Sequence, residues 1–173
     1  MNEMLRLIKS RRSVKKYKDT PVSKADIEKI VEAGTWAATG LNKQSPIILA
    51  VTNKEVIKKL SRLNAGNDPF HRADPFYGAP CVLVVLADKS VSTHVYDGSL
   101  VMGNMLLAAH SLGLGACWIH RARETFETDE GKQILSDLGI QGEYEGIGNC
   151  IVGYPDMTPA DKPRKENWVY YIN

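Results

Sequence analysis

The segment from Cys81 to Ala87 constrains the fold more than any other part of the chain. It reads Cys-Val-Leu-Val-Val-Leu-Ala, with an apolar side chain at every position. β-Branched residues favour an extended strand, and a strand that is apolar on both faces is usually covered on both faces. The surrounding apolar run, Ala79 to Ala87, is much shorter than the roughly 20 residues of a membrane-spanning helix. We therefore expect a central strand of a buried sheet and no membrane partner.

Similar patterns divide the rest of the chain into strands and helices. Short apolar runs predict strands over 46–51, 116–119 and 146–153, and helical spacing predicts helices over 4–8, 23–34, 54–63, 96–112 and 128–138. Ser23 begins a helix-capping pattern, and Gly34 offers a stop for the same helix. Strands with helical cover predict a three-layer α-β-α sandwich of the α/β (α+β) class. The length of 173 residues predicts a single domain over 1–173.

The helix expected over 96–112 leaves almost no polar face. A helix that is apolar all round is buried all round, and two interpretations of this burial remain open. The helix is either a central core helix or one whose cover is completed by a second subunit. Small residues at Gly98, Gly103 and Ala109 would permit the close approach of another chain.

Several classes of function find no support in the sequence. Cys81, Cys117 and Cys150 are widely separated among apolar neighbours and are interpreted as reduced core thiols. No cysteines or histidines have the spacing of a zinc site, so we expect no metal. The net charge of +2 lacks the basic excess of a nucleic-acid-binding protein. The N-terminus mixes charged with apolar residues, and we expect a cytoplasmic protein.

Two glycine pairs, Gly113 with Gly115 and Gly146 with Gly148, do not form a dinucleotide-binding fingerprint. The first pair precedes its strand and the second lies within one, whereas the fingerprint needs a strand, a glycine turn and a helix in this order. The chain also has neither a P-loop motif nor a GxSxG nucleophile elbow. Nucleotide hydrolysis and serine-hydrolase chemistry therefore lose their main support.

Three polar segments could bind an anion or a heterocycle. The first is Arg11 to Lys16, whose guanidinium, hydroxyl and ammonium groups suit a phosphate, although cations at a helix end also simply complement the helix dipole. The second is the loop Thr39 to Ser45, where the carboxamides of Asn42 and Gln44 can donate and accept, or serve as ordinary polar turn residues. The third is Lys162 to Lys165, which could close over a phosphate or remain a solvated tail.

The order of these segments resembles the FMN-dependent nitroreductase family along essentially the whole chain. The resemblance lies in Arg11-Arg12-Ser13-x-Lys15-x-Tyr17, Asn42-x-Gln44, Leu112-Gly113-Leu114-Gly115-Ala116-Cys117-Trp118-Ile119 and Lys162-Pro163-Arg164. It implies a mixed sheet covered by helices and a homodimer with two FMN sites at the subunit interface. It also implies an NAD(P)H oxidoreductase that reduces nitroaromatic or quinone-type acceptors by ping-pong hydride transfer. No residue decides between NADH and NADPH.

The resemblance also assigns the flavin site residue by residue. It implies contacts from Arg11, Arg12, Ser13, Lys15, Lys162 and Arg164 of one subunit, from Thr39, Gly40, Asn42 and Gln44 of the other, and from the backbone of Trp118, Ile119, His120 and Arg121 near flavin N5 and O4. A cation such as Lys15 or Arg12 would stabilise the reduced flavin. Two departures from the family pattern bear on substrate choice: Ser45 intervenes before Pro46, and His120-Arg121 replace an acidic-glycine pair.

Flavin carries the chemistry in such an enzyme, so no catalytic side chain is expected. His120 is a candidate to steer an anionic substrate or to donate a proton, although a histidine at a strand end is often merely solvated. Trp36 is expected to pack in the core. The loop 64–80 is a candidate lid that carries Phe70, His71, Phe76 and Tyr77.

Three alternatives to the function of an NAD(P)H oxidoreductase remain open. They are a flavin-binding or storage protein without turnover, another flavin-dependent reductase activity of the same fold, and a small anion-binding module.

Overall fold

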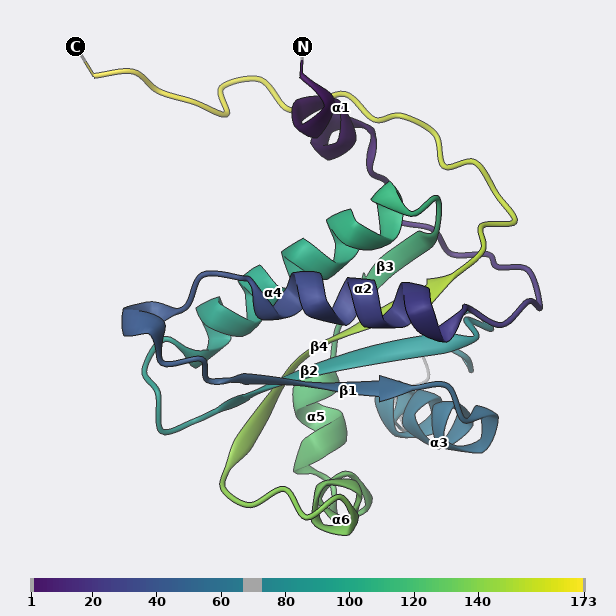
Figure 1. Cartoon of the computed structure of the whole chain (residues 1–173), viewed down its shortest axis with the longest axis vertical. Helices are drawn as coiled ribbons and strands as arrows, with labels where there is room; N and C mark the ends of the chain where they lie inside the picture. Colours follow the sequence, from purple (N-terminus) through teal and green to yellow (C-terminus); the bar gives the residue numbers. More distant parts are fainter. Residues whose placement is uncertain (1, 67–72, 173) are drawn as a thin grey trace.

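A four-stranded sheet lies at the centre of the computed structural model, which describes residues 2–66 and 73–172 (Figure 1). The strands are β1 (Pro46–Val51), β2 (Cys81–Asp88), β3 (Gly115–Ile119) and β4 (Tyr144–Gly153). The helices are α1 (Glu3–Ser10), α2 (Lys24–Thr35), α3 (Lys54–Ala65), α4 (His94–Ser111), α5 (Ala122–Glu127) and α6 (Asp129–Asp137), with a 3-10 helix, η1, at Gly40–Asn42. Each expected strand and helix has a counterpart here, whereas α5 has none in the sequence-based prediction.

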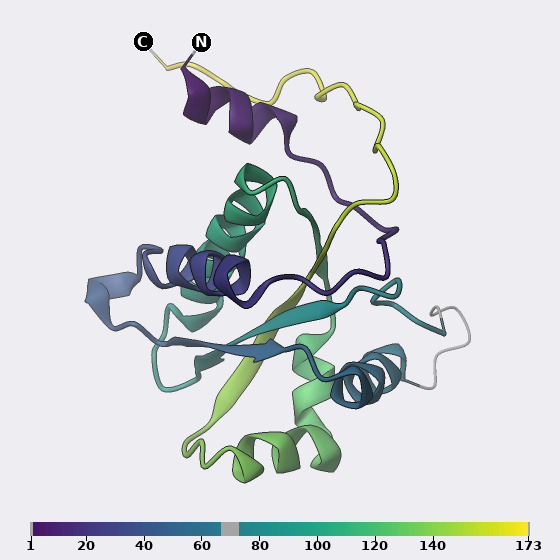
Figure 2. The same cartoon turned by 45° about the vertical axis from the view of Figure 1, so that its right-hand side comes forward.

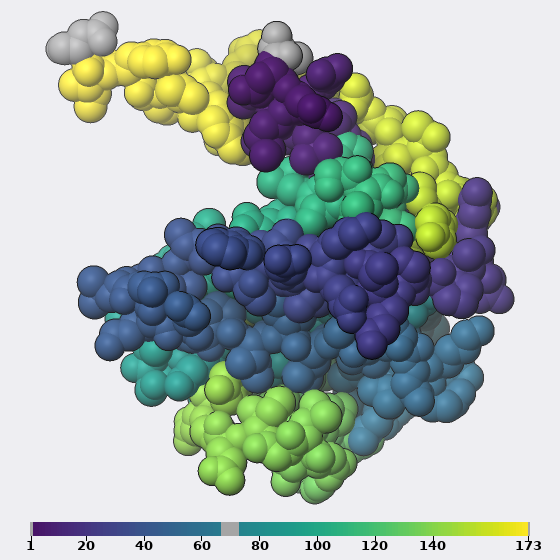
Figure 3. Space-filling model, in the orientation of Figure 1, coloured from purple at the N-terminus to yellow at the C-terminus, as the bar shows by residue number. Residues whose placement is uncertain are grey.

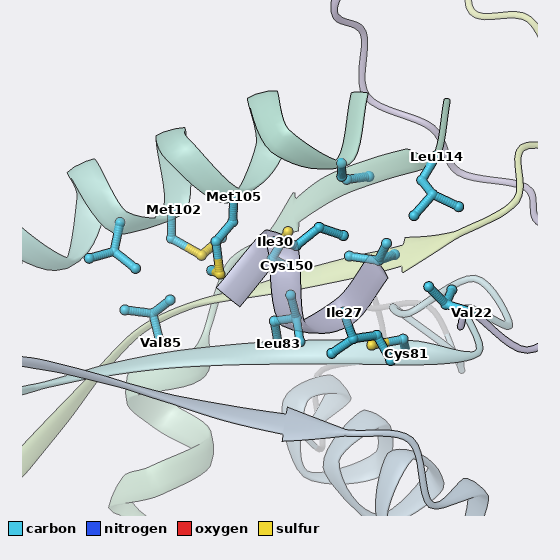
Figure 4. Packing of buried hydrophobic residues seen from close by; sticks show 14 of the residues in the cluster. Val22, Ile27, Ile30, Cys81, Leu83, Val85, Met102, Met105, Leu114 and Cys150 are labelled. Atoms are coloured by element: carbon cyan, nitrogen blue, oxygen red, sulfur yellow. The ribbon is translucent and has the colours of Figure 1, made fainter. Parts of the chain in front are cut away.

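The sheet is the middle layer of three. Its order is β1-β2-β4-β3, so β2 lies inside it, as the sequence predicts. Helices α2 and α4 cover one face, and α3, α5 and α6 cover the other (Figures 1 and 2). Leu83 and Val85 of β2 pack with α2 and α4 (Figure 4), whereas Val82 and Val84 face the opposite helices. Successive strand side chains point to opposite faces, so the all-apolar strand serves two cores and the predicted sandwich is confirmed.

Neighbouring strands of the sheet run antiparallel: β1 with β2, β2 with β4, and β4 with β3. Within the described residues, the parallel part of the expected mixed sheet is an isolated bridge between Ser13 and Ala116. This bridge holds the N-terminal segment against the edge strand β3, which brings the first polar segment onto the sheet.

Gly34 does not end its helix, because α2 continues to Thr35. A Cβ atom at Gly34 would come within 2.9 Å of the Met105 side chain on α4. The missing side chain therefore allows α2 and α4 to pack closely. The role of Gly34 is this close packing, and not the expected one of a helix stop.

Helix α4 is buried on one side and exposed on the other in the single chain. Val101, Met102 and Met105 lie in the core, whereas Tyr96 is 73% exposed and Leu100 is 51% exposed. The expectation of burial all round is therefore wrong for one chain alone. The exposed apolar side chains favour the interpretation in which a second subunit completes the cover.

The two ends of the chain run side by side before the C-terminal tail leaves the body. The Lys18 N–H donates to the Tyr154 carbonyl over 2.9 Å, and the Asp156 N–H donates to the Lys16 carbonyl over 3.0 Å. Residues 161–172 are exposed, and they extend past α1 as an arm (Figure 3). The arm carries apolar side chains, of which Tyr171 is 84% exposed.

Candidate functional site

Contacts between the chain ends gather two of the three polar segments. Arg12 forms an ion pair with Asp161, and the Lys16 ammonium lies 2.7 Å from the Asp156 carboxylate. These pairs align residues 12–16 with the start of the tail, so residues 162–164 follow directly after a residue that Arg12 binds. The side chains of Lys162 and Arg164 are themselves exposed. The N-terminal basic residues and the beginning of the basic tail therefore lie in one region.

A cavity of about 560 Å³ lies where the chain ends meet the last turn of α4. Arg11, Arg12 and His110 line it, together with Asp161, which is already paired with Arg12. The Nε atom of Arg12 is buried and has no hydrogen-bond partner among the described residues. A buried N–H donor without an acceptor destabilises the fold unless a ligand accepts from it. The cavity thus has the positive charge that suits an anionic group, and one of its lining arginines has a donor without an acceptor.

The edge strand β3 runs from this cavity to residues 118–121, whose backbone is expected to contact the flavin. The Ser13–Ala116 bridge lies near the start of β3, and His120 follows four residues later, roughly 13 Å along the strand. Trp118 lies over Gly148 of β4, where a Cβ atom would come within 2.7 Å of the indole ring. The absence of a side chain at Gly148 therefore leaves the space that the Trp118 ring occupies.

The backbone turns sharply after β3. Arg121 has a φ of +72°, in the left-handed region that glycine adopts freely and other residues adopt at about 1 kcal/mol or more. The buried Asn64 side chain donates to the His120 carbonyl over 2.7 Å, and the buried Asn149 side chain donates to the Ile119 carbonyl over 3.4 Å. These two amides hold the end of β3. The turn keeps a conformation that suits glycine although an arginine occupies the position.

The second polar segment lies at the opposite end of α4 and is held by Asp97, which is 2% exposed. Its carboxylate accepts hydrogen bonds from the Gly40 N–H over 2.9 Å and from the hydroxyls of Ser45 and Thr93 over 2.9 and 3.0 Å. Burial works to raise the pKa of Asp97, but the hydrogen bonds to its ionised form lower the pKa below the ordinary value. Asp97 is therefore a charged anchor for the loop.

The loop itself is unusual in its backbone. Leu41, Asn42 and Gln44 have φ angles of 50°, 53° and 50°. The Gln44 N–H donates to the Thr39 hydroxyl over 3.2 Å, and the Gln44 side chain donates to the Asn42 side chain over 3.1 Å. Leu41 is 92% exposed. A constrained loop thus displays an apolar side chain and two carboxamides away from its own chain.

The two groups of candidate residues are far apart in one chain. Asp97 anchors the loop and His110 lines the cavity, and the two residues are thirteen positions apart on α4. At 1.5 Å per residue this is roughly 20 Å. The loop and the basic cavity therefore lie towards opposite ends of α4.

Two expectations about aromatic residues are wrong. Trp36 is 81% exposed, because it lies at the C-cap of α2, beyond the positions that face the core. Phe76 is 1% exposed and packs in the core on the face of the sheet that α3 and α5 cover, so its side chain is not part of a lid. Tyr77 is half-buried, with the Lys15 ammonium 5.6 Å from its ring centre. The predictions for Phe70 and His71 lie outside the described residues.

The three cysteines are buried and free. Over residues 2–66 and 73–172, no cluster of three or more His, Cys, Asp or Glu side chains could hold a metal ion. In the same ranges, no helix combines the length and apolarity that crossing a membrane requires.

Sequence patterns missed three residues that shape the candidate site: Asp97, Asn64 and His110. A lone carboxylate within an otherwise apolar helix was a usable signal for Asp97, because a buried charge needs partners. Asn64 and His110 carry no comparable signal, since each acts on a segment that is distant in the sequence.

The model of the nitroreductase family matches residues 8–157. A relative from Archaeoglobus fulgidus, whose name gives NADH dehydrogenase or NAD(P)H nitroreductase, is 30% identical over 97% of this chain and 100% of its own. An FMN reductase from Bacillus subtilis that uses NAD(P)H is 27% identical over 95% of this chain and 70% of its own. A nitroreductase with bound FMN from Bacteroides fragilis is 27% identical, with a TM-score of 0.89 and all of both chains covered.

Proposed function

The chain belongs to the nitroreductase family, and we propose that it is an FMN-dependent NAD(P)H oxidoreductase, a flavoprotein that reduces nitroaromatic or quinone-type acceptors. The names of its relatives support both the flavin and the nicotinamide co-substrate. The single observation that carries the proposal is the cavity in which Arg11 and Arg12 meet, with a buried Arg12 N–H that lacks an acceptor. The phosphate of FMN would supply that acceptor.

The chain ends would hold the phosphate end of FMN. Arg11 and Arg12 line the cavity, and Lys162 and Arg164, which follow the cavity residue Asp161 in the tail, would reach the phosphate from outside. Arg12 is already paired with Asp161, so Arg11 is the one of the two cations that has no carboxylate partner within the described residues. We assign Arg11 the larger share of the phosphate interaction.

Other residues of the same chain would orient the flavin ring system. When bound, FMN supplies hydride transfer between NAD(P)H and the acceptor. Lys15 and Ser13 alternate with the buried Val14, so both side chains point away from the core. The Lys15 ammonium would stabilise negative charge on the ring. The backbone from Trp118 to Arg121 would donate N–H groups to the ring edge.

A second copy of the chain would complete each site. The roughly 20 Å of α4 between Asp97 and His110 support a site in which Thr39, Gly40, Asn42 and Gln44 come from the partner. The exposed apolar residues Leu41, Leu100 and Tyr171 would provide surface for this homodimer. Residues 1–173 would then form one flavin-binding domain that functions in pairs.

We further propose a ping-pong mechanism, in which NAD(P)H binds and leaves before the acceptor occupies the same place. Initial rates at several NADH concentrations should then give parallel double-reciprocal lines, and intersecting lines would refute this mechanism. The three buried free thiols suit a reducing compartment, so we assign the protein to the cytoplasm.

The central experiment uses the purified full-length protein. A yellow protein whose absorbance at about 450 nm is bleached by NADH or NADPH is the expected result. A yellow protein that neither nucleotide bleaches would instead indicate flavin storage, and a colourless protein that binds no added FMN would refute flavin chemistry altogether.

A variant pair tests the assigned phosphate contact. Arg11→Ala should weaken FMN binding by about 1.5–3 kcal/mol, roughly tenfold to a hundredfold in Kd, for the loss of one charge-assisted bond. Arg6→Ala removes an exposed cation from α1 and should leave the Kd unchanged. Equal Kd values for the two variants would contradict the role of Arg11.

A further inference from the structure

We propose that His110 is a further residue of the phosphate cavity and that it takes up a proton when the phosphate of FMN binds, so that flavin retention strengthens as the pH falls below neutrality. The proposal rests on the proposed function and adds a residue and a pH response to it. The geometry is direct: His110 is in the last turn of α4 and lines the same cavity as Arg11 and Arg12.

Hydrogen bonding around His110 has room for the protonated ring. The Ser10 hydroxyl lies 3.2 Å from the Leu7 carbonyl, and His110 Nε2 lies 2.8 Å from the same hydroxyl oxygen. A hydroxyl has one proton to donate, and both ring nitrogens of an imidazolium carry a hydrogen. The protonated ring can therefore donate from Nε2 to Ser10 while the Ser10 hydroxyl donates to Leu7.

The charges of the cavity determine the sign of the effect. The titratable and charged residues that line it are Arg11, Arg12, Asp161 and His110 itself. Burial of the ring, followed by the two neighbouring guanidinium groups, lowers the pKa of His110 in the free protein. A phosphate dianion would offset the repulsion from both arginines and stabilise the imidazolium. By linkage, a ligand whose binding favours the protonated form binds more tightly as protons become available.

The test measures FMN affinity across pH in the wild-type protein and in His110→Gln. Glutamine retains a donor for Ser10 but cannot titrate. The phosphate of FMN itself gains a proton near pH 6, so the informative quantity is the difference between the two proteins at each pH. The wild-type protein should bind FMN about threefold to tenfold more tightly than the variant near pH 6 and equally near pH 8, since one unit of pKa shift corresponds to tenfold in affinity.

Two controls separate a phosphate response from a general loss of structure. Ser111→Ala changes the next residue of α4, which is exposed and lies outside the cavity lining, and should retain the wild-type pH profile. Riboflavin lacks the phosphate, so its affinity should differ equally little between wild type and His110→Gln at every pH.

A measurement on the wild-type protein alone covers the case in which His110→Gln fails to fold. Calorimetric titration with FMN at pH 7, in two buffers of different ionisation enthalpy, counts the protons taken up when most of the phosphate is already dianionic. Net uptake supports the proposal, and zero uptake overturns it. Flavin that binds and turns over with the same pH profile in both proteins overturns the role of His110 while leaving the proposed function intact. Absence of any flavin binding overturns both.

Discussion

Asp97 offers the sharpest test of how the loop 39–45 is held in place. Three donors converge on its buried carboxylate: the Gly40 N–H and the hydroxyls of Ser45 and Thr93. Asp97→Asn keeps the shape but removes the charge and replaces one of the two acceptor oxygens by an NH2 group, which cannot accept a hydrogen bond. A hydrogen bond to a charged group contributes about 1.5–3 kcal/mol and a neutral one about 0.5–1.5 kcal/mol, so each bond loses at least about 1 kcal/mol. We therefore expect the variant to lose at least about 3 kcal/mol of unfolding free energy at pH 7.

Urea denaturation followed by circular dichroism measures this loss, and pH provides the internal check. The pKa of Asp97 is lower in the folded protein than its ordinary value. The stabilisation by its charge is therefore complete at neutral pH and declines as the pH falls below about 4. The difference between wild type and Asp97→Asn should shrink at about pH 3. The exposed Asp137→Asn is the matched control, with a change within about 0.5 kcal/mol. A loss no larger than that of the control, or one that does not shrink in acid, would refute this reasoning.

Three other predictions concern packing, pH and assembly. Gly148→Ala places a Cβ atom within 2.7 Å of the Trp118 indole and should cost about 1–3 kcal/mol in thermal unfolding, whereas Gly103→Ala, with nothing within 4 Å, should cost no stability. Without flavin, the lowered pKa of His110 means that the folded state binds a proton less readily than the unfolded state. Stability should therefore decline as the pH falls through about 6.5, and His110→Gln should remove this part of the slope. Leu41→Glu, at a side chain 92% exposed in one chain, should leave circular dichroism unchanged but shift light-scattering mass towards the monomer, and an unchanged mass would count against the loop as an interface.

The strands were predictable because their signal is local. An apolar residue at every position of 81–87 indicates a strand with two covered faces, and the structure places it inside the sheet. Helix α5 was not predictable in the same way, because its six residues are too few for a clear helical period. Its position depends on Gly146, where a Cβ atom would come within 2.3 Å of the Ala122 backbone. That contact joins segments more than twenty residues apart.

The candidate site was likewise predictable only in part. The residue types along the chain indicated the basic stretch and the carboxamide loop, resemblance to a family assigned both to a flavin, and the structure shows how each is held. The role of Asp97 depends on Gly40 and Ser45, which are more than fifty residues away in the sequence. Trp36 is exposed in the same way for a reason that its neighbours in the sequence do not reveal: the described residues of one chain leave the end of α2 uncovered. Patterns along a chain predict burial, but they do not say whether the cover comes from the same copy.

The length of α4 between Asp97 and His110 has a consequence for mixed assemblies if the proposed homodimer shares its sites between two chains. A chain with a defect at Arg11 still carries an intact loop, and a chain with a defect at Asp97 still carries an intact basic cavity. In a heterodimer of the two variants, one of the two proposed sites would receive both intact parts and the other would receive both defective ones. Two inactive preparations, exchanged by mixing, would restore part of the activity that neither has alone. Dilution would act in the opposite sense, because specific activity would decrease as pairs separate.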